Sequence, residues 1–436
     1  MATRWSRRTL IAVVAAVCVV AAGLAVGVAA LVGALGGDGD GRSEAVLPTV
    51  PAVRSWEPAS GPGWRPDRDT RVVADPDGPL ADEARLLARE VHAEYGTGDA
   101  GTGDVELVVD TSIPGGPEAY RLTVADGRVT IAGPADNGVF YGTRTLVQVL
   151  RAEGRMPEGT VRDRPDRRQR GLLLDIARKH YSAAWIRDRV REMADLKLNQ
   201  LQLHVSDDQA FRLPSRTHPE VVSPQHLTWE ELRDIVRLAH SRHITVVPEI
   251  DSPGHLGAVL RAHPELQLRD VRGRPVSGAV DISRPEAGRL VDDLLREYAP
   301  VFGAGAEKEL GHYWHLGGDE YQALTVEDPE AAFPQLARLA RREHGPRATV
   351  RDLATAWLND RAETVRDLGW TPQVWNDGLH RGGVVRPTRQ AQVAYWTGTE
   401  QGQRAPAEYL REGRRVVNLN DAYLYYVLGE PNQFRY

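Results

Sequence analysis

The sequence of 436 residues contains a single cysteine, Cys18. One cysteine excludes a disulfide within the chain and a zinc site built from several thiolates. Lysine is also scarce, and the balance of 54 basic against 60 acidic residues gives a formal net charge of −6. A nucleic-acid-binding protein needs a basic domain or stripe, so we expect no nucleic-acid partner.

The N-terminus combines three arginines in Met1–Arg8 with a run, Thr9–Leu35, that carries no charge. The run is longer than the ~7–15 apolar residues of a signal peptide and long enough for a membrane helix of ~20 residues. It favours an uncleaved anchor with the arginines inside the cell. The alternative is a long signal peptide. Both predict that the rest of the chain is exported, either membrane-anchored or secreted.

The remaining sequence divides by composition and periodicity. We assign residues 1–36 to the signal or anchor, 37–65 to a linker, 66–165 to a small α+β domain and 166–436 to a catalytic domain. In the small domain, strands are expected at 105–110, 119–126 and 128–133, and helices at 80–95 and 136–152. Asp126-Gly127 between two of these strands predicts a tight hairpin.

Short apolar segments alternate with amphipathic helical patterns from residue 170 onward. Candidate strands lie at 171–175, 200–205, 244–250, 313–317, 373–377, 392–396 and 415–420. One of the expected helices, 229–242, follows Thr228 as N-cap with Glu231 three residues on, a capping-box pattern. Alternating strands and helices predict parallel βαβ units, and seven such strands in series favour a (β/α)8 barrel. A doubly wound sheet is the alternative, but no glycine-rich phosphate loop follows the first strand.

Polar and aromatic residues follow six of the seven candidate strands. They are Asp175, Asp207, Asp208, Asp251, His255, Asp319, Glu320, Trp375, Asn376, Asp377 and the segment 418–421. In a barrel the carboxyl ends of the strands meet at one face, where active sites lie. Acids also follow strands as helix N-caps, but that explains only one or two of these positions.

Converging carboxylates, a histidine and tryptophans indicate a sugar site. Aromatic rings stack on the apolar faces of sugars, and carboxylates bind hydroxyls or act on the glycosidic oxygen. A metal site formed by Asp207, His255 and Glu320 is the alternative, because ligands from different strands leave no spacing pattern.

Four segments carry a resemblance to a known family. RGLLLDIARKH (170–180), LQLHVSDDQ (201–209), VVPEIDSPGH (246–255) and HLGGDEY (315–321) resemble the signature blocks of glycoside hydrolase family 20, the β-N-acetylhexosaminidases, in the family's order. The small preceding domain also looks like that of the family, so the resemblance covers about residues 45–436. It implies an exo-acting enzyme that needs no metal or cofactor and removes terminal β-linked GlcNAc or GalNAc from glycans or chitin-type oligosaccharides.

The resemblance also accounts for the adjacent acids of HLGGDEY. Neighbouring side chains on a strand point to opposite faces, so Asp319 and Glu320 are badly placed to flank one bond. Family 20 enzymes are instead substrate-assisted: the 2-acetamido group of the sugar is the nucleophile and forms an oxazolinium intermediate. Glu320 would then be the general acid and base, and Asp319 would orient the acetamido group.

Further roles are implied for other residues. Arg170 would hold sugar hydroxyls. Asp207 would pair with His255, which tunes Glu320, with Asp208 as the alternative partner and Asp251 in support. An acetamido pocket would be formed by Trp375, Trp396 and Tyr423. The plainer interpretations are that Arg170 is a surface arginine, that His255 is a structural histidine, and that Trp375 and Trp396 pack in the core.

The chain departs from the family pattern in two places. Where the family commonly has Tyr-Leu-Asp, this chain has Tyr423-Leu424-Tyr425, which is more similar to the branch of dispersin-type and lacto-N-biosidase-type enzymes. The chain also ends at Tyr436 without a counterpart of the family's eighth strand, which predicts a C-terminally truncated barrel. A lacto-N-biosidase, a poly-GlcNAc hydrolase and a catalytically dead glycan-binding surface protein are therefore the alternative functions.

Overall fold

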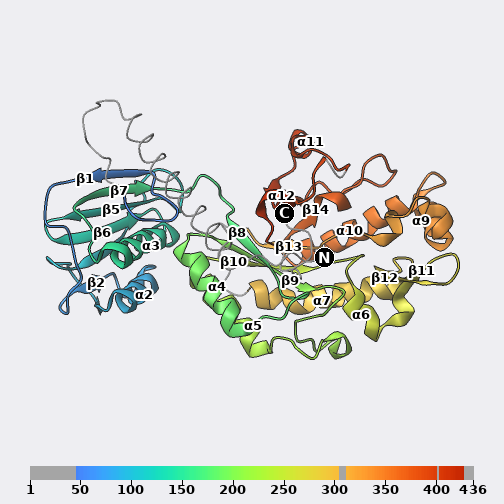
Figure 1. Cartoon of the computed structure of the whole chain (residues 1–436), viewed down its shortest axis with the longest axis horizontal. Helices are drawn as coiled ribbons and strands as arrows, with labels where there is room; N and C mark the ends of the chain where they lie inside the picture. Colours follow the sequence, from blue (N-terminus) through green and yellow to red (C-terminus); the bar gives the residue numbers. More distant parts are fainter. Residues whose placement is uncertain (1–45, 304–310, 400–401, 427–436) are drawn as a thin grey trace, which may run out of the picture. The chain divides into compact units, whose positions relative to one another are not determined.

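The computed structural model describes residues 46–303, 311–399 and 402–426, which contain two large β-sheets (Figure 1). The predicted N-terminal anchor (1–36) and the first part of the predicted linker, residues 37–45, lie outside the described residues. None of the helices in the described ranges is both long enough and apolar enough to cross a membrane.

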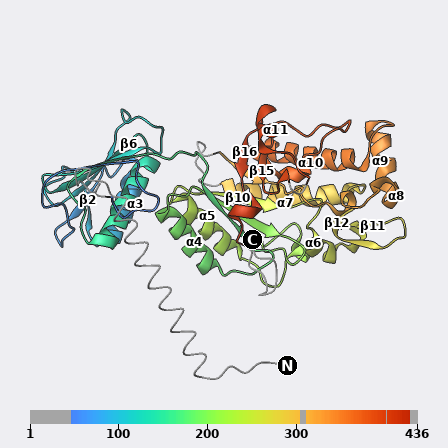
Figure 2. The same cartoon turned by 45° about the horizontal axis from the view of Figure 1, so that its top comes forward.

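The first sheet is mixed, with the strand order β1-β7-β5-β6-β4-β2-β3. Its strands are β1 (Ser55–Pro58), β2 (Arg71–Val73), β3 (Glu94–Gly96), β4 (Val105–Val109), β5 (Tyr120–Ala125), β6 (Arg128–Gly133) and β7 (Gly159–Asp163). The amphipathic helices α2 (Ala81–Val91) and α3 (Asp136–Glu153) pack against it (Figures 1 and 2). This is the α+β fold that the sequence predicts.

The hairpin predicted at Asp126-Gly127 is confirmed. β5 and β6 are antiparallel with Ala125 opposite Arg128, and the two turn residues have φ values of 53° and 69°, as a tight hairpin requires. The helix predicted over 80–95 is too long, since α2 ends at Val91 and His92 takes a left-handed φ of 57°.

The second sheet is parallel throughout, and its strands follow one another in chain order from β8 to β16. They are β8 (Gly171–Asp175), β9 (Gln200–Ser206), β10 (Thr245–Ile250), β13 (Tyr313–His315), β14 (Thr371–Trp375), β15 (Gln392–Tyr395) and β16 (Val416–Asn418). All seven strands predicted after residue 170 are present. β13 is shorter than predicted because Gly317 and Gly318 turn the chain with φ values of 70° and 96°.

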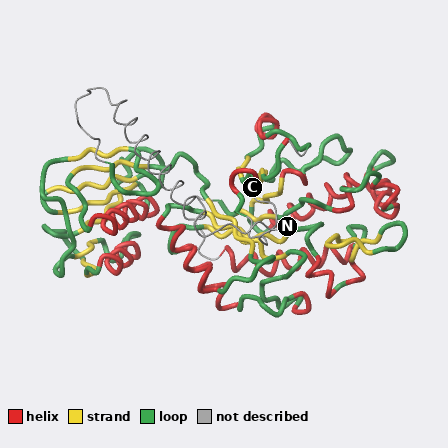
Figure 3. Tube along the Cα trace, viewed as in Figure 1, coloured by secondary structure: helices red, strands yellow, loops and turns green. Residues whose placement is uncertain are grey.

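Helices lie between most successive strands of this sheet, as in a (β/α)8 barrel (Figure 3). They are α4 (Ala183–Asp195), α5 (Trp229–His240), α6 (Gly257–Ala262), α7 (Pro285–Gly303), α8 (Pro329–Ala332), α9 (Pro334–His344), α10 (Val350–Asp367) and α11 (Pro406–Arg411), with a hairpin of β11 (Gln267–Arg269) and β12 (Pro275–Val280). Between β14 and β15 there is a short 3-10 helix (Asn376–Gly378), and α12 (Asp421–Leu424) follows β16. The capping box predicted at Thr228 and Glu231 begins α5.

Several strand residues of the second sheet are polar although they are buried. The Glu249 carboxylate accepts hydrogen bonds from Gln202 at 2.8 Å and from the Trp375 indole at 2.9 Å. It also lies 3.3 Å from a ring nitrogen of both His204 and His315. Because burying polar groups is costly unless they are paired, this network fixes which way the strand side chains face.

Candidate active site

The loops that follow the strands of the second sheet bring most of the predicted site residues together. Asp207 follows β9, His255 follows β10, and Asp319 and Glu320 follow β13. Contacts of 3.5 Å or less join these four side chains through His255. Parallel strands end at the same edge of their sheet, so residues far apart in sequence meet there.

Asp207 is buried, and its carboxylate has three basic partners. Nε2 of His204 lies 2.8 Å away, a guanidinium nitrogen of Arg178 lies 2.7 Å away, and Nδ1 of His255 lies 3.4 Å away. Burial alone would raise the pKa of Asp207, but the hydrogen bonds from the two imidazoles and the charge of Arg178 lower it far below its ordinary value. Asp207 is therefore a permanent buried negative charge.

His255 connects that charge to the adjacent acids. Its Nε2 atom lies 3.4 Å from Oε2 of Glu320 and 3.5 Å from Oδ2 of Asp319. Neither contact is aligned as a good hydrogen bond, so the attraction is mainly between charges. Burial lowers the pKa of His255, but its acidic neighbours, with the hydrogen bond to Asp207 first among them, outweigh burial and raise that pKa to about 12. The imidazole is thus cationic at neutral pH.

The turn after β13 directs both acids toward His255. Gly317 and Gly318 have positive φ, and so does Glu320, at 48°, a region that side-chain-bearing residues seldom occupy. The Gly318 N–H donates to Asp251 Oδ1 at 2.9 Å, and the Glu320 N–H donates to Asp377 Oδ2 at 3.1 Å. The expectation of two acids on opposite faces of a strand is wrong, because β13 ends before them.

The carboxyl groups around this turn differ in protonation. Burial and the charge of Asp319 raise the pKa of Asp251 well above its ordinary value, and the same two causes raise that of Asp377 to about 7. Glu320 is 56% exposed, and the contact with the His255 cation lowers its pKa. The cluster therefore holds protonated and ionised carboxyl groups side by side.

Aromatic side chains lie beside the acids. The Trp396 indole donates to Asp377 Oδ1 at 2.8 Å, and its ring meets the Trp375 ring edge-on with centroids 6.4 Å apart. The Tyr425 ring stacks on Trp396, with centroids also 6.4 Å apart and planes 20° apart. Tyr423, in contrast, is 88% exposed. The structure thus places Tyr425, rather than the predicted Tyr423, against the tryptophans.

Two other predicted site residues are held by different partners. Arg170 precedes β8, at the opposite end of the strand from the acids, and its guanidinium pairs with Glu118 of the small domain at 2.8 Å. Asp208 accepts the Gly257 N–H at 2.9 Å, although one of its carboxylate oxygens lies within 4.8 Å of ligand atoms of Asp207 and His255. Arg170 does not reach the cluster, and Asp208 lies at its edge. Asp251 reaches it through its bond to Gly318.

Sequence reasoning missed Arg178 and the pair of His204 and Glu249. Arg178 lies just past the carboxyl end of β8 and contacts both Asp175, at 2.9 Å, and Asp207. Its position after the strand, compared with that of Arg170 before it, is the signal that distinguishes the two arginines. His204 and Glu249 are signalled only as charged or polar residues inside otherwise apolar strands.

Two sets of side chains in the cluster could hold a metal, but several of their ligand atoms already bind other protein groups. Asp207, Asp208 and His255 approach one another within 4.8 Å, as do Asp251, His255 and Asp319. However, Asp207 is bonded to Arg178 and to two imidazoles, and Asp208 is bonded to the Gly257 backbone. The arrangement favours proton transfer over metal binding.

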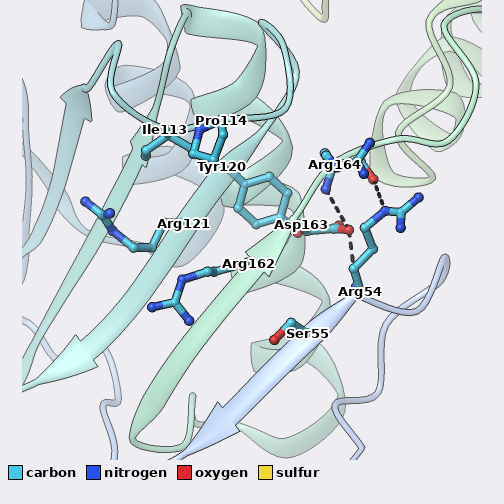
Figure 4. A pocket seen from close by; sticks show the side chains of 9 residues that line it. All are labelled: Arg54, Ser55, Ile113, Pro114, Tyr120, Arg121, Arg162, Asp163 and Arg164. Carbon is cyan, nitrogen blue, oxygen red and sulfur yellow. Dashed lines mark hydrogen bonds between the residues drawn. The ribbon is translucent and has the colours of Figure 1, made fainter.

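A separate pocket of about 340 Å³ lies in the small domain (Figure 4). It is lined by arginines around Tyr120 and Asp163, whose carboxylate accepts a hydrogen bond from Tyr120 at 2.8 Å and pairs with Lys197 at 3.1 Å. Asp163 is therefore already paired with Tyr120 and Lys197. The chemistry therefore points to the loops of the second sheet and not to this pocket.

Two sequence models of one family match the chain. The model described as "Glycosyl hydrolase family 20, catalytic domain" matches residues 168–435, and that described as "Glycosyl hydrolase family 20, domain 2" matches residues 46–164. The two matches cover the described parts of both sheets.

Curated relatives match parts of their own length. A lacto-N-biosidase from Bifidobacterium bifidum is 32% identical over 383 residues, which are 86% of this chain and 33% of the relative. A beta-N-acetylhexosaminidase from Cellulomonas fimi is 35% identical over 271 residues, 57% of this chain and 52% of the relative. This chain therefore spans about a third to a half of the length of these two proteins.

Solved structures have the same fold. A GH20 beta-N-acetylhexosaminidase from Streptomyces coelicolor superposes with a TM-score of 0.69 at 26% identity, covering 86% of this chain and 75% of that one. A GH20 exo beta-N-acetylglucosaminidase from Vibrio harveyi, solved with N-acetylglucosamine, gives 0.71 at 22% identity, covering 86% and 61%.

The turn that carries the acids depends on a missing side chain at Gly317. A Cβ atom there would lie 1.6 Å from Asp251 Oδ1, and the residue has a φ of 70°. We expect Gly317→Ala to lose roughly 2–5 kcal/mol of unfolding free energy, since overpacking adds to backbone strain. Urea denaturation measures this loss.

Gly369→Ala is the matched control, because Gly369 has a φ of 87° but open space around its Cβ position. It should lose only the backbone part, about 1–2 kcal/mol. Equal losses in the two variants would contradict the steric role of Gly317.

Proposed function

The chain belongs to glycosyl hydrolase family 20, and from this premise we propose that it is an exo-acting β-N-acetylhexosaminidase. It would remove terminal β-linked GlcNAc or GalNAc from glycans or chitin-type oligosaccharides and retain the anomeric configuration. The observation that carries the proposal is the pair Asp319 and Glu320, which meet one ring nitrogen of His255.

Adjacent acids suit a substrate-assisted mechanism. A retaining enzyme with its own nucleophile needs two carboxyl groups that flank the scissile bond, about 5–5.5 Å apart. In family 20 the 2-acetamido oxygen of the sugar attacks the anomeric carbon instead. Glu320 then protonates the leaving oxygen and afterwards takes a proton from water. Asp319 accepts the acetamido N–H and stabilises the positive charge that develops on the ring formed.

The buried network supports these roles through electrostatics. The charge of Asp207 keeps His255 protonated, and the His255 cation in turn stabilises the carboxylate form of Glu320. The carboxylate form is the one that takes a proton from water. A sugar that displaces water from the exposed Glu320 side chain raises the pKa of that group by desolvation, which favours the acid form needed first.

The aromatic residues fit the acetamido group. The Trp396 indole donates to Asp377, and the rings of Trp375 and Tyr425 lie against Trp396. Arg178, which is fixed by Asp175 and Asp207, is a cationic donor for sugar hydroxyls at the same edge of the sheet. This combination of apolar surface and charged donors is typical of sugar sites.

Export to the cell surface is part of the same proposal. The uncharged run Thr9–Leu35 after three arginines supports a membrane tether. The full chain is then expected in the membrane fraction after an alkaline wash, with its catalytic domain sensitive to protease added outside intact cells. Recovery in the soluble cytoplasmic fraction would contradict both the tether and export.

Substitution of the two acids tests the activity. Hydrolysis of an aryl β-GlcNAc by the full chain should fall about 10²–10⁴-fold in Glu320→Gln, and about 10²–10³-fold in Asp319→Asn, which weakens stabilisation of the developing charge. Glu327→Gln, an exposed acid seven residues further on, is the matched control and should keep full rate.

Product analysis accompanies this assay. A monosaccharide released first as the β anomer supports the proposal. Release of a disaccharide, as the name of the Bifidobacterium relative implies for that protein, would replace it by a lacto-N-biosidase. Sugar binding without any turnover would indicate a glycan-binding protein.

The pH profile tests the link between His255 and Glu320. Removing the imidazolium in His255→Gln takes away the charge that stabilises the Glu320 carboxylate, so the pKa of Glu320 rises. The protonated acid then persists to higher pH. The limb of kcat/KM that falls with rising pH should therefore move to higher pH, with a lower maximal rate. A limb that stays in place or moves to lower pH would exclude this coupling.

A further inference from the structure

Two copies of the tripeptide His-Pro-Glu lie in different loops and meet in space. The first, His218 to Glu220, enters a short 3-10 helix in the long loop between β9 and α5. The second, His263 to Glu265, follows α6 in the loop after β10. The two imidazole rings lie edge-on, with centroids 6.4 Å apart. None of these residues belongs to the catalytic cluster.

Glu220 is the meeting point of the two rings. Its Oε1 atom lies 3.0 Å from Nδ1 of His218 and 2.9 Å from Nε2 of His263. One potential ligand atom from each of the three side chains lies within 4.8 Å of the other two. Around a tetrahedral zinc ion with bonds of about 2.0–2.1 Å, neighbouring ligand atoms are about 3.3–3.4 Å apart. The two ring nitrogens lie 3.0 and 2.9 Å from Glu220 Oε1, so each would move outward by about 0.4 Å to reach that spacing.

The second nitrogen of each ring faces another carboxylate. Nδ1 of His263 lies 3.1 Å from Glu265 Oε1, and Nε2 of His218 lies 3.5 Å from Asp293 Oδ2 on α7. Histidines that bind a metal typically donate their other N–H to a carboxylate, which fixes the tautomer and strengthens the metal bond. His263 has that arrangement with Glu265, whereas Nε2 of His218 lies near Asp293 without a hydrogen bond.

The negative charge around the two histidines also favours the binding of a cation. Glu220, Glu265 and Asp293 contribute three negative charges, and neutral imidazoles contribute none. A neutral imidazole has one N–H, so it cannot donate to carboxylates on both sides. The arrangement is balanced either by extra protons on the rings or by a divalent ion that replaces them between the rings and Glu220.

We propose that His218, Glu220 and His263 form a binding site for a divalent transition-metal ion, with zinc as the reference ion. Two imidazoles and one carboxylate are a known zinc donor set that leaves a fourth position for water. Calcium and magnesium prefer oxygen ligands, so the two nitrogens select against them. The histidine side chains are 19% and 22% exposed, which leaves the site accessible from solvent.

A metal here would brace the catalytic face. The loop that contains His218 begins directly after Asp207, and His263 lies eight residues beyond His255. α6 and the 3-10 helix at Pro219–Val221 already pack together. The ion would join the two loops that position Asp207 and His255 without taking part in the chemistry. The two His-Pro-Glu segments are what make this clamp possible.

The test is a titration of the full chain with ZnCl2 by calorimetry after treatment with EDTA, together with thermal denaturation. One zinc ion per chain and a raised midpoint are expected. Affinity should fall at least tenfold in His218→Gln and His263→Gln, and about 10–100-fold in Glu265→Gln, which removes only the outer carboxylate. CaCl2 should leave the midpoint unchanged.

His226→Gln is the matched control. His226 is an exposed histidine in the same loop, bonded to the Ser223 carbonyl oxygen and outside the cluster, so its loss should not change zinc affinity. In EDTA all variants should unfold like the parent chain, which separates metal binding from folding. The proposal is overturned if the parent chain binds no zinc. It is also overturned if His218→Gln and His263→Gln bind zinc with the same affinity as the parent chain.

Discussion

The buried negative charge of Asp207 is the constraint on which the candidate site depends. A carboxylate removed from water is stable only when it is paired and hydrogen-bonded, and Asp207 draws His204, His255 and Arg178 around itself. The cation formed at His255 then governs the protonation of Glu320. One buried charge at the end of β9 thus sets the state of an acid that follows β13.

A second buried charge supports the same arrangement from inside the sheet. Glu249 joins His204 to the Trp375 indole, so the strand that positions Asp207 and the strand that positions the tryptophan share one carboxylate. Removing either partner would leave Glu249 incompletely paired. The polar interior therefore acts as a frame that holds acidic and aromatic groups in fixed relation.

The glycines of the turn after β13 allow the side chains of the neighbouring residues Asp319 and Glu320 to point to the same place. On a strand, Asp319 and Glu320 would face opposite sides. Positive φ values at Gly317, Gly318 and Glu320 bring both carboxyl groups to the same ring nitrogen. Backbone strain at such a position persists only when its surroundings hold it. Asp251 and Asp377 hold it through the two backbone N–H groups of the turn.

Sequence patterns alone predict the parallel strands, the hairpin at Asp126-Gly127, the family and the pair of Asp319 and Glu320, because periodicity and contiguous motifs depend on neighbours along the chain. Arg178 and Tyr425 reach the cluster whereas Arg170 and Tyr423 do not, and this selection follows from the folding of the loops. The contact between His218 and His263 has the same origin. Contacts between distant loops depend on where each strand ends and which way its side chains point, and no local pattern encodes these.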